Sequence, residues 1–283
     1  MGVGAPAGGP FPVRTPRQGR PGRWWPGPTP LWLRALGYYA YQYKRTWRSS
    51  VTASFLYPVL YLAAMGVGLG TLVDHHVHHV AGVTYTSFVG PGVLAATAMQ
   101  IGTNEATYPV MAAIKWVRTY WAMLATPLRV EDVLRGHLGW IGVRLASMAA
   151  VFLLVLAAFG VVRSPWALLC LPAAALTGLA FATPVAAFAA TQERDSGFAA
   201  IYRFGLIPLF LFSGTFYPIT RLPGWAQPIA YATPLYHGVA LCRGLVLGTL
   251  PLVPSLGDAA YLLGLAGLGY LLAGIAYRRR LVV

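Results

Sequence analysis

Long apolar stretches separated by short polar segments dominate the chain after residue 50. Crossing the hydrocarbon core of a bilayer takes about 20 residues of helix, and six stretches reach that length. We place them near residues 51–73, 87–113, 138–161, 166–189, 204–221 and 258–277. A backbone that crosses a bilayer must satisfy its own hydrogen bonds, and the alternating pattern of barrel strands is absent. The pattern therefore predicts an all-α integral membrane protein with six transmembrane helices.

Residues 31–50, which precede the first stretch, have an amphipathic helical pattern. Leu33 and Leu36 belong to an apolar series at helical spacing, while Arg34 and Arg45 project from another side. The tryptophans and tyrosines of this segment suit a membrane interface, because their rings are apolar and their tips form hydrogen bonds. We interpret the segment as an amphipathic interface helix in the headgroup plane. The alternative is that it is simply the start of the first span.

Residues 1–30 differ in composition from the rest of the chain. Fifteen of the 30 are Gly or Pro, four are Arg and none is acidic. Such a composition predicts a disordered basic tail. The domain prediction is therefore a tail over 1–30, an interface helix over 31–50 and a six-span domain over 51–283.

The segment 222–250, between the last two predicted spans, is too long for a turn and moderately apolar. Pro223, Pro228 and Pro234 interrupt it before it could span a bilayer. We predict an external re-entrant helical segment that dips into the outer leaflet.

The distribution of the cations gives the orientation. The chain is 57% hydrophobic and only 10% charged, yet its formal net charge is +14. With a cytoplasmic N-terminus, 17 of the 21 Lys and Arg residues fall on the inner side, three fall outside, and Arg144 lies within the third span. Cytoplasmic loops carry the excess of Lys and Arg in membrane proteins. The charge thus predicts two cytoplasmic termini and does not indicate a nucleic-acid partner.

Glu105, beside Asn104 in the second predicted span, is the polar group that is most costly to place in a membrane. A carboxylate at this depth costs a few kcal/mol unless it is paired, protonated or facing water. It is therefore an intramembrane anchor paired with a cation such as Arg144, a lining residue of a translocation path, or part of a proton path. Arg144 itself lies close enough to the cytoplasmic edge for its stem to snorkel there.

Motifs of catalysis and of cofactor binding are absent. The chain has no GxxxxGK[ST] phosphate loop, no GxSxG, no HExxH and no paired carboxylates. We therefore predict no catalytic, cofactor-binding or metal site. Whether the histidine cluster His75–His79 binds metal stays open, because consecutive histidines in a loop are typical of weak, adventitious sites. Cys170 and Cys242 are interpreted as core or lipid-facing thiols.

The predicted cytoplasmic helix over residues 115–124 carries more apolar surface than a solvated loop should. Exposed aromatic and apolar patches usually contact a protein partner or the headgroups. The residues concerned are Lys115, Trp116, Arg118, Tyr120 and Trp121.

Two runs carry a resemblance to a known family. Residues 118–133 resemble the cytoplasmic segment of type-2 ABC exporter permeases, and residues 210–219, with Leu222, Trp225 and 234–238, resemble their fifth span and external segment. The likeness covers about residues 31–280. Within the family, the chain is most similar to lipo-oligosaccharide (nodulation-factor) and daunorubicin-type drug export permeases.

The resemblance implies a permease in the cell (inner) membrane that pairs with a second permease copy, identical or different. A separate ABC ATPase subunit would bind the ATP and dock on the 115–124 helix, while the permease itself holds no cofactor. The cargo would be an amphipathic substrate, lipid-linked, oligosaccharide or drug-like. Family members commonly carry Glu after Gly136 and an acidic residue at position 121, whereas this chain has His137 and Trp121. The competing class is an integral membrane enzyme or assembly factor acting on lipids.

Overall fold

The computed structural model describes residues 30–64, 68 and 82–282, and the chain divides into the units Met1–Pro30 and Leu31–Val283. The predicted tail up to residue 29 and His75–His79 lie outside the described residues. All helices and helical turns below belong to the second unit. They are α1 (Leu31–Leu62), α3 (Tyr85–Ala106), α4 (Tyr108–Met111), the π-helical η2 (Ala112–Trp116), α5 (Thr119–Leu124), α6 (Val130–Ala158), the 3₁₀ turn η3 (Pro165–Leu169), α7 (Cys170–Thr191), α8 (Ser196–Ala200), the π-helical η4 (Ile201–Leu206), α9 (Ile207–Phe212), the 3₁₀ turn η5 (Ile219–Arg221), α10 (Gln227–Tyr231), α11 (Pro234–Leu247) and α12 (Leu252–Leu281).

The all-helical prediction is confirmed for the part of the chain that the structure describes, since each of its elements is helical. Three helices there are long and apolar enough to cross a membrane: Val130–Ala158, Pro165–Thr191 and Leu252–Leu281. The segment Ser196–Phe212 is apolar but shorter. Six transmembrane helices therefore stay a prediction.

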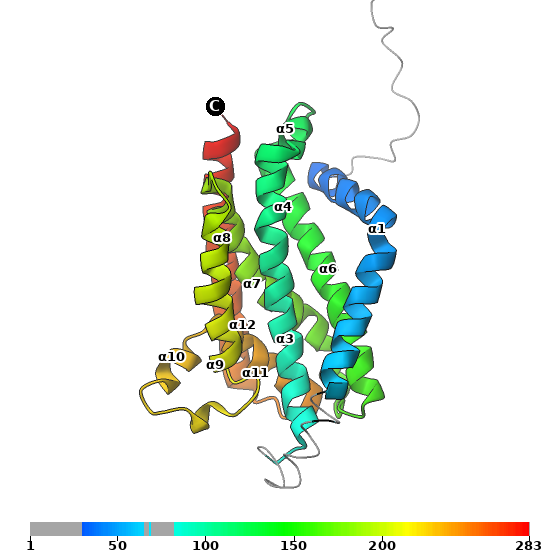
Figure 1. Ribbon diagram of the computed structural model, residues 1–283, viewed down its shortest axis with the longest axis vertical. Coiled ribbons are helices and arrows are strands. Elements are labelled where there is room, and N and C mark those ends of the chain that lie inside the picture. The colour runs from blue at the N-terminus through cyan, green and yellow to red at the C-terminus, as the bar shows by residue number, and fades with distance from the viewer. Residues whose placement is uncertain (1–29, 65–67, 69–81, 283) are drawn as a thin grey trace, which may run out of the picture. The chain divides into compact units, whose positions relative to one another are not determined.

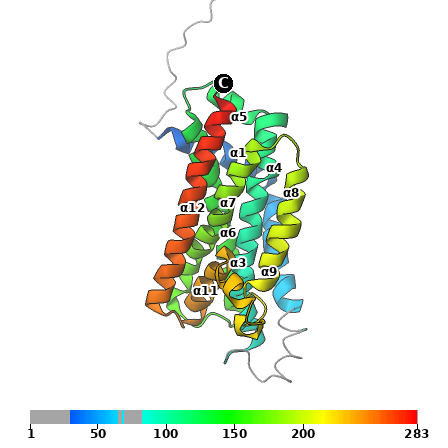
Figure 2. The same ribbon diagram turned by 90° about the vertical axis from the view of Figure 1, so that its left-hand side faces the viewer.

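The long helices run side by side between two ends of the unit (Figures 1 and 2). One end, called the α5 end below, holds α5, the first turns of α1 and the last turns of α12 (Figure 1). The opposite end, called the α11 end, holds α10, α11 and the start of α3 (Figure 1). Arg278, Arg279 and Arg280 occupy the last turn of α12, so a cluster of cations lies at the α5 end.

Helix α7 packs against α3, α6, α11 and α12, and small residues let these helices approach closely. An added Cβ at Gly102 of α3 would collide with the Gly178 carbonyl oxygen of α7. At Gly178 it would lie 2.8 Å from the carbonyl oxygen of Ala98. On the other side of α7, Gly269 of α12 packs against the Pro184 ring, where an added Cβ would lie 2.6 Å from the proline nitrogen. The backbone of α7 is thus in direct contact with two neighbouring helices.

A proline interrupts the second predicted span. Pro109 has no N–H to donate to the carbonyl of Glu105, and its ring clashes with that carbonyl in a regular helix. Accordingly α3 ends at Ala106, Thr107 takes a non-helical conformation, and the chain continues as α4 and η2. Glu105 therefore lies in the last turn of α3, directly before the break.

The first predicted boundary does not appear as a break in the helix. Helix α1 runs without interruption from Leu31 to Leu62, although its first turns lie at an angle to the remainder of the helix (Figure 1). The interface role of residues 31–50 stays a prediction. Ala35 is buried because α1 packs on α6, where an added Cβ at Gly136 would lie 2.5 Å from the Ala35 methyl group.

The fifth apolar stretch differs from its predicted limits. It begins at Ser196 instead of residue 204 and ends at Phe212 instead of residue 221. A turn follows in which Gly214 has a φ of 77°, a conformation that costs other residues energy.

The predicted external segment contains α10 and α11, and a half-buried cation joins it to the bundle. The Arg243 side chain donates to the Phe88 carbonyl at 3.0 Å and to the Gly214 carbonyl at 2.9 Å, and it covers the Phe88 ring. The free thiols Cys170 and Cys242 are both buried next to each other in the same region, which confirms them as core residues.

The contact of Gly102 with Gly178 predicts a strong effect of one methyl group. Changing Gly102 to Ala should lower stability by about 1–3 kcal/mol, the usual cost of overpacking, because backbone atoms must move. The control is Gly264→Ala, since an added Cβ at Gly264 of α12 meets nothing within 4 Å. Thermal unfolding of the two detergent-solubilised variants checks this, and equal midpoints would contradict it.

Candidate functional site

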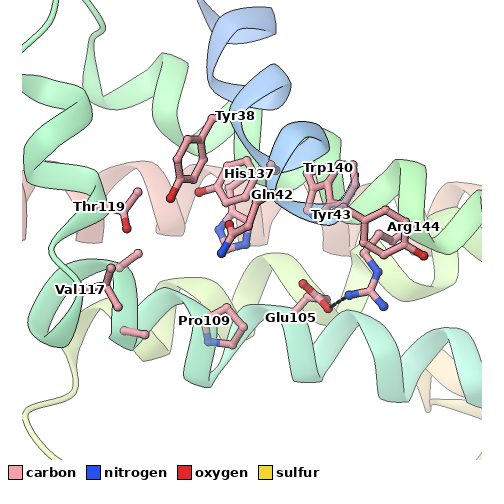
Figure 3. Close-up of a pocket in the computed structure, with 13 residues that line it drawn as sticks. Tyr38, Gln42, Tyr43, Glu105, Pro109, Val117, Thr119, His137, Trp140 and Arg144 are labelled. Atoms are coloured by element: carbon pink, nitrogen blue, oxygen red, sulfur yellow. Dashed lines mark hydrogen bonds and ion pairs between the residues drawn. The ribbon is translucent and has the colours of Figure 1, made fainter. Parts of the chain in front are cut away.

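A cavity of about 310 Å³ lies between α1, α3, α6 and the η2–α5 segment. Figure 3 shows it with α1 on one side and α3 on the other. Its walls combine aromatic rings with polar groups, which distinguishes it from the apolar grooves elsewhere on the described residues. The lining residues are Tyr38, Tyr39, Gln42, Tyr43, Glu105, Pro109, Ala112, Ala113, Val117, Thr119, His137, Trp140 and Arg144.

Glu105 and Arg144 form an ion pair across this cavity (Figure 3). Their side chains keep 18% and 26% of their surface exposed. The guanidinium of Arg144 also lies 5.4 Å from the centre of the Tyr43 ring. Arg144 is thus the cation that pairs with Glu105, and its snorkelling toward the cytoplasmic edge stays a prediction. This geometry also joins two of the alternatives for Glu105, pairing with Arg144 and lining a polar cavity.

Asn104 does not belong to this cavity. Its side-chain oxygen accepts a hydrogen bond from the Tyr202 hydroxyl of η4. Asn104 and Glu105 are adjacent in α3, so their side chains point in different directions around the helix. Asn104 joins α3 to η4, while Glu105 faces Arg144. A role for Asn104 in a translocation path or as an intramembrane anchor stays a prediction.

A chain of stacked and hydrogen-bonded rings extends from the cavity toward the α5 end. The Tyr39 ring of α1 stacks on His137 of α6, with centroids 5.0 Å apart and planes 15° apart. His137 Nδ1 lies 2.6 Å from the hydroxyl of Tyr120 in α5. That hydroxyl lies 3.3 Å from the hydroxyl of Tyr277 in α12. Four helices, α1, α5, α6 and α12, thus meet through one series of contacts.

The predicted docking residues divide into an exposed group and a buried one. Trp116 is 59% exposed and Trp121 38% exposed, and Val117 and Arg118 between them are also exposed. Tyr120 is completely buried, so its assignment to the exposed surface is wrong. It lies on the inner side of α5, where it bonds His137. Below, "docking surface" means Trp116, Val117, Arg118 and Trp121.

Lys115 belongs to a network of charges at the α5 end. Its ammonium group lies 2.7 Å from the carboxylate of Glu193, which also accepts from Arg280 at 2.5 Å. Glu193 follows α7, so the network joins η2, the α7–α8 connection and α12. Hydrogen bonds from Arg280 and Lys115 lower the pKa of the Glu193 carboxyl from its ordinary value of 4.5 to about 2.

A histidine–carboxylate pair lies near the α11 end. His237 Nδ1 is 2.7 Å from Asp258 and joins α11 to α12, while Tyr261 packs on the imidazole. Among the hydrogen bonds of the described residues, none connects this pair to a serine or cysteine nucleophile. Nor do the described residues contain a group of three or more His, Cys, Asp or Glu arranged to hold a metal ion.

Sequence reasoning missed His137, Tyr39 and Tyr277 as members of the site. His137 stood out only as a departure from the family pattern. Tyr120 and Tyr277 are 157 residues apart in the chain. No local pattern relates them, so their contact follows only from the packing of α5 against α12.

These observations define a helical integral membrane protein with a polar cavity near one end of its bundle and an exposed aromatic surface beside it. The family described as ABC-2 type transporter matches residues 36–247, and the chain belongs to this family. The cavity, the docking surface and α11 all lie within the matched range, whereas α12 follows it.

Relatives cover most of the chain. Nodulation protein J of Rhizobium leguminosarum bv. trifolii is 34% identical over 206 residues, which is 71% of this chain and 77% of that protein. Nodulation protein J of Rhizobium meliloti is 32% identical over 212 residues, or 75% of this chain and 79% of that protein. The family resemblance inferred from the two sequence runs is confirmed. The family makes the chain a membrane permease component of transport.

Breaking the ion pair should destabilise the bundle. Glu105→Gln leaves Arg144 without its counter-charge and should cost about 2 kcal/mol, less than a fully buried pair because both side chains keep some exposure. Glu105→Gln combined with Arg144→Gln should recover part of the loss. Thermal unfolding of the single and double variants in detergent measures the coupling, and strictly additive losses would show that the two groups act independently.

The charge network predicts a pH dependence. Because the pKa of Glu193 is depressed in the folded state, its pairing stabilises the protein above about pH 4.5 and is lost as the pH falls toward about 2. The stability difference between the wild type and Glu193→Gln should therefore be constant from pH 8 to 5 and shrink below that. Thermal unfolding midpoints of the two proteins, measured from pH 8 to below pH 5, test this prediction. A stability difference that grows on acidification would exclude the pairing.

Proposed function

We propose that this chain is the membrane-spanning permease subunit of an ATP-driven ABC exporter. The observation that carries the proposal is the exposed docking surface. The chain belongs to the ABC-2 type transporter family, and its sequence contains no phosphate-binding loop, so a separate subunit must supply one. A separate ABC ATPase subunit binds ATP and docks on this surface. A second permease copy completes the transporter, and an amphipathic substrate leaves the cytoplasm between the two copies.

The chemistry of the docking surface supports this assignment. Tryptophan and arginine are enriched where protein partners bind most strongly. The Trp121 indole donates to the Ile114 carbonyl at 3.0 Å, so the surface is held to η2 rather than left on a loose loop. Arg118 has a φ of 56°, a left-handed conformation that is unfavourable for a residue other than glycine. Such strained residues cluster at functional sites.

The docking surface is connected to the cavity by the same short segment. Val117 belongs to the docking surface and also lines the cavity, as does Thr119, while Trp116 and Arg118 are exposed on either side of Val117. Tyr120 follows and bonds His137, another wall residue. A displacement of the docking surface by the ATPase therefore changes the cavity directly, and through Tyr277 it reaches α12. Glu105 and Arg144 either line the path that opens or hold the bundle together around it.

The topology that we propose has six spans with both termini in the cytoplasm. The spans are α1, then α3 with α4 and η2, α6, α7, α8 with η4 and α9, and α12. The α5 end faces the cytoplasm, in agreement with its cations and with the excess of Lys and Arg on cytoplasmic segments. Residues 31–50 lie in the headgroup region, and α10 and α11 form the external re-entrant segment.

The substrate class follows from the resemblance to lipo-oligosaccharide and drug export permeases and from the relatives named Nodulation protein J. An aromatic cavity with one carboxylate and one guanidinium fits a molecule that has both apolar and hydroxyl-bearing parts.

Changing Trp116 to Asp should reduce binding of the ATPase about tenfold or more, as expected for an aromatic anchor of an interface. The experiment co-expresses the chain with the ABC ATPase whose reading frame we expect beside its own, and it measures the ATPase retained after affinity purification in detergent. ATP hydrolysis should require the ATPase subunit and be absent from the permease alone.

The matched control is Trp166→Asp. Trp166 in η3 is 67% exposed but lies near the opposite end, so its change should leave ATPase retention unaltered. Tyr120→Asp should instead lower the yield of folded protein, because it places a charge in the core. Unchanged retention by Trp116→Asp would refute docking at this surface. Substrate turnover by the permease alone would favour the membrane-enzyme class.

A further inference from the structure

A second hollow, distinct from the polar cavity, opens on the flank of the bundle. It is a groove of about 380 Å³ formed by α6, α7 and α12, with Trp32 of α1 at its rim. These three helices are the ones that are long and apolar enough to cross a membrane among the described residues. A groove that is open between membrane-spanning helices faces the hydrocarbon core of the bilayer. Lipid acyl chains are therefore the molecules next to the groove.

The floor of the groove is apolar and kept open by glycines. Gly142 of α6 faces Leu179 of α7, and Ala266 of α12 lines the same groove, while Gly139 of α6 lies against Leu36 and Trp32 of α1. An added Cβ at Gly142 would meet only Leu179, at 3.8 Å, so the space above this glycine is unfilled. From Arg135 to Gly142 the groove follows α6 for seven residues, about 10 Å of helix. This length and this lining suit part of one acyl chain.

The end of the groove nearest the α5 end is polar and positively charged. Arg135 donates to the Tyr270 hydroxyl at 2.9 Å, and both line the groove. Arg135 and Arg278 both pair with the carboxylate of Glu131, and the charge of Asp132 also acts on Arg135. The guanidinium of Arg135 remains half exposed and is free to make further contacts. Trp32 beside it is the residue type that marks a membrane interface.

We propose that this groove binds one anionic phospholipid of the surrounding leaflet. Its phosphate group contacts Arg135 and the Tyr270 hydroxyl, and one of its acyl chains lies along Gly139 and Gly142. The bound lipid connects α6, α7 and α12 on the flank where their side chains leave a gap. The proposal rests on the membrane location of the family and does not require that the chain be an exporter.

The headgroup, not the chain, decides which lipid binds. Moving an acyl chain from the bilayer into an apolar groove gains little, because both surroundings are hydrocarbon. Basic pockets between spanning helices select anionic headgroups, and each cation near the membrane surface contributes about 1 kcal/mol. The groove should therefore prefer phosphatidylglycerol to phosphatidylcholine of the same acyl composition.

Native mass spectrometry of the detergent-solubilised chain, titrated with dioleoyl phosphatidylglycerol or dioleoyl phosphatidylcholine, tests the proposal. Wild type should retain one phosphatidylglycerol more tightly than phosphatidylcholine. Arg135→Gln should weaken the retention of phosphatidylglycerol about fivefold, which corresponds to about 1 kcal/mol. Gly142→Leu, which fills the groove, should weaken the retention of both lipids.

The matched controls are Arg279→Gln and Gly264→Leu. Arg279 is a cation of α12 outside the groove, and Gly264 lies on α12 with open space beside it. Neither should alter lipid retention, and the thermal midpoint of each variant shows that it is folded. Equal retention of both lipids by the wild type, or folded groove variants that retain lipid as the wild type does, would overturn the proposal. Loss of a dimer peak in Gly142→Leu without loss of lipid would instead assign the groove to a second copy of the chain.

Discussion

The close approach of helix backbones at α7 is the contact on which the rest of the structure depends. Helices in a bilayer gain little from hiding apolar surface, so close packing and polar contacts must hold them together. Gly102 and Gly178 bring α3 against α7 backbone to backbone, and Gly269 brings α12 against the Pro184 ring. With α7 fixed in this way, α6 and α11 pack on its remaining sides. The polar cavity and the groove that we propose for a lipid lie between the helices that surround α7.

Polar groups complete the assembly where glycines do not reach. The break at Pro109 leaves Glu105 at the end of α3, opposite Arg144 of α6. An ion pair costs desolvation energy, and it persists here because the cavity keeps both groups partly exposed. On the opposite end, Arg243 bonds backbone carbonyls of α3 and of the turn at Gly214. Each of these polar contacts joins segments that are far apart in the chain.

The sequence predicted the features that depend on composition and on periodicity. The helical class, the apolar segments, the prolines that interrupt residues 222–250 and the family all follow from such local patterns. It left open whether the helix over 31–50 continues into the first span, because an amphipathic face looks the same whether it meets headgroups or another helix. Nor did it predict that Tyr120 is buried. The helical spacing of aromatic residues does not show which face of the helix packs against the rest of the protein. Contacts such as Tyr120 with Tyr277 depend on how the helices pack, and single-sequence patterns hold no information on that.

Because Tyr120 is buried, a movement of the docking surface reaches the polar cavity more directly than it would if Tyr120 were exposed. An exposed tyrosine could contact a partner but would have no packed neighbours to move. Tyr120 lies between Trp121, which is on the docking surface, and the buried His137 and Tyr277. Packed side chains do not deform continuously, so a shift of α5 must be accommodated by the rings stacked behind it. Of those rings, Tyr39 and His137 also form the cavity wall, and α1 and α12 therefore respond to the same displacement. In the docking that we propose, aromatic contacts at Trp121 and His137 take the place of the acidic residues that we expect at these positions in the family.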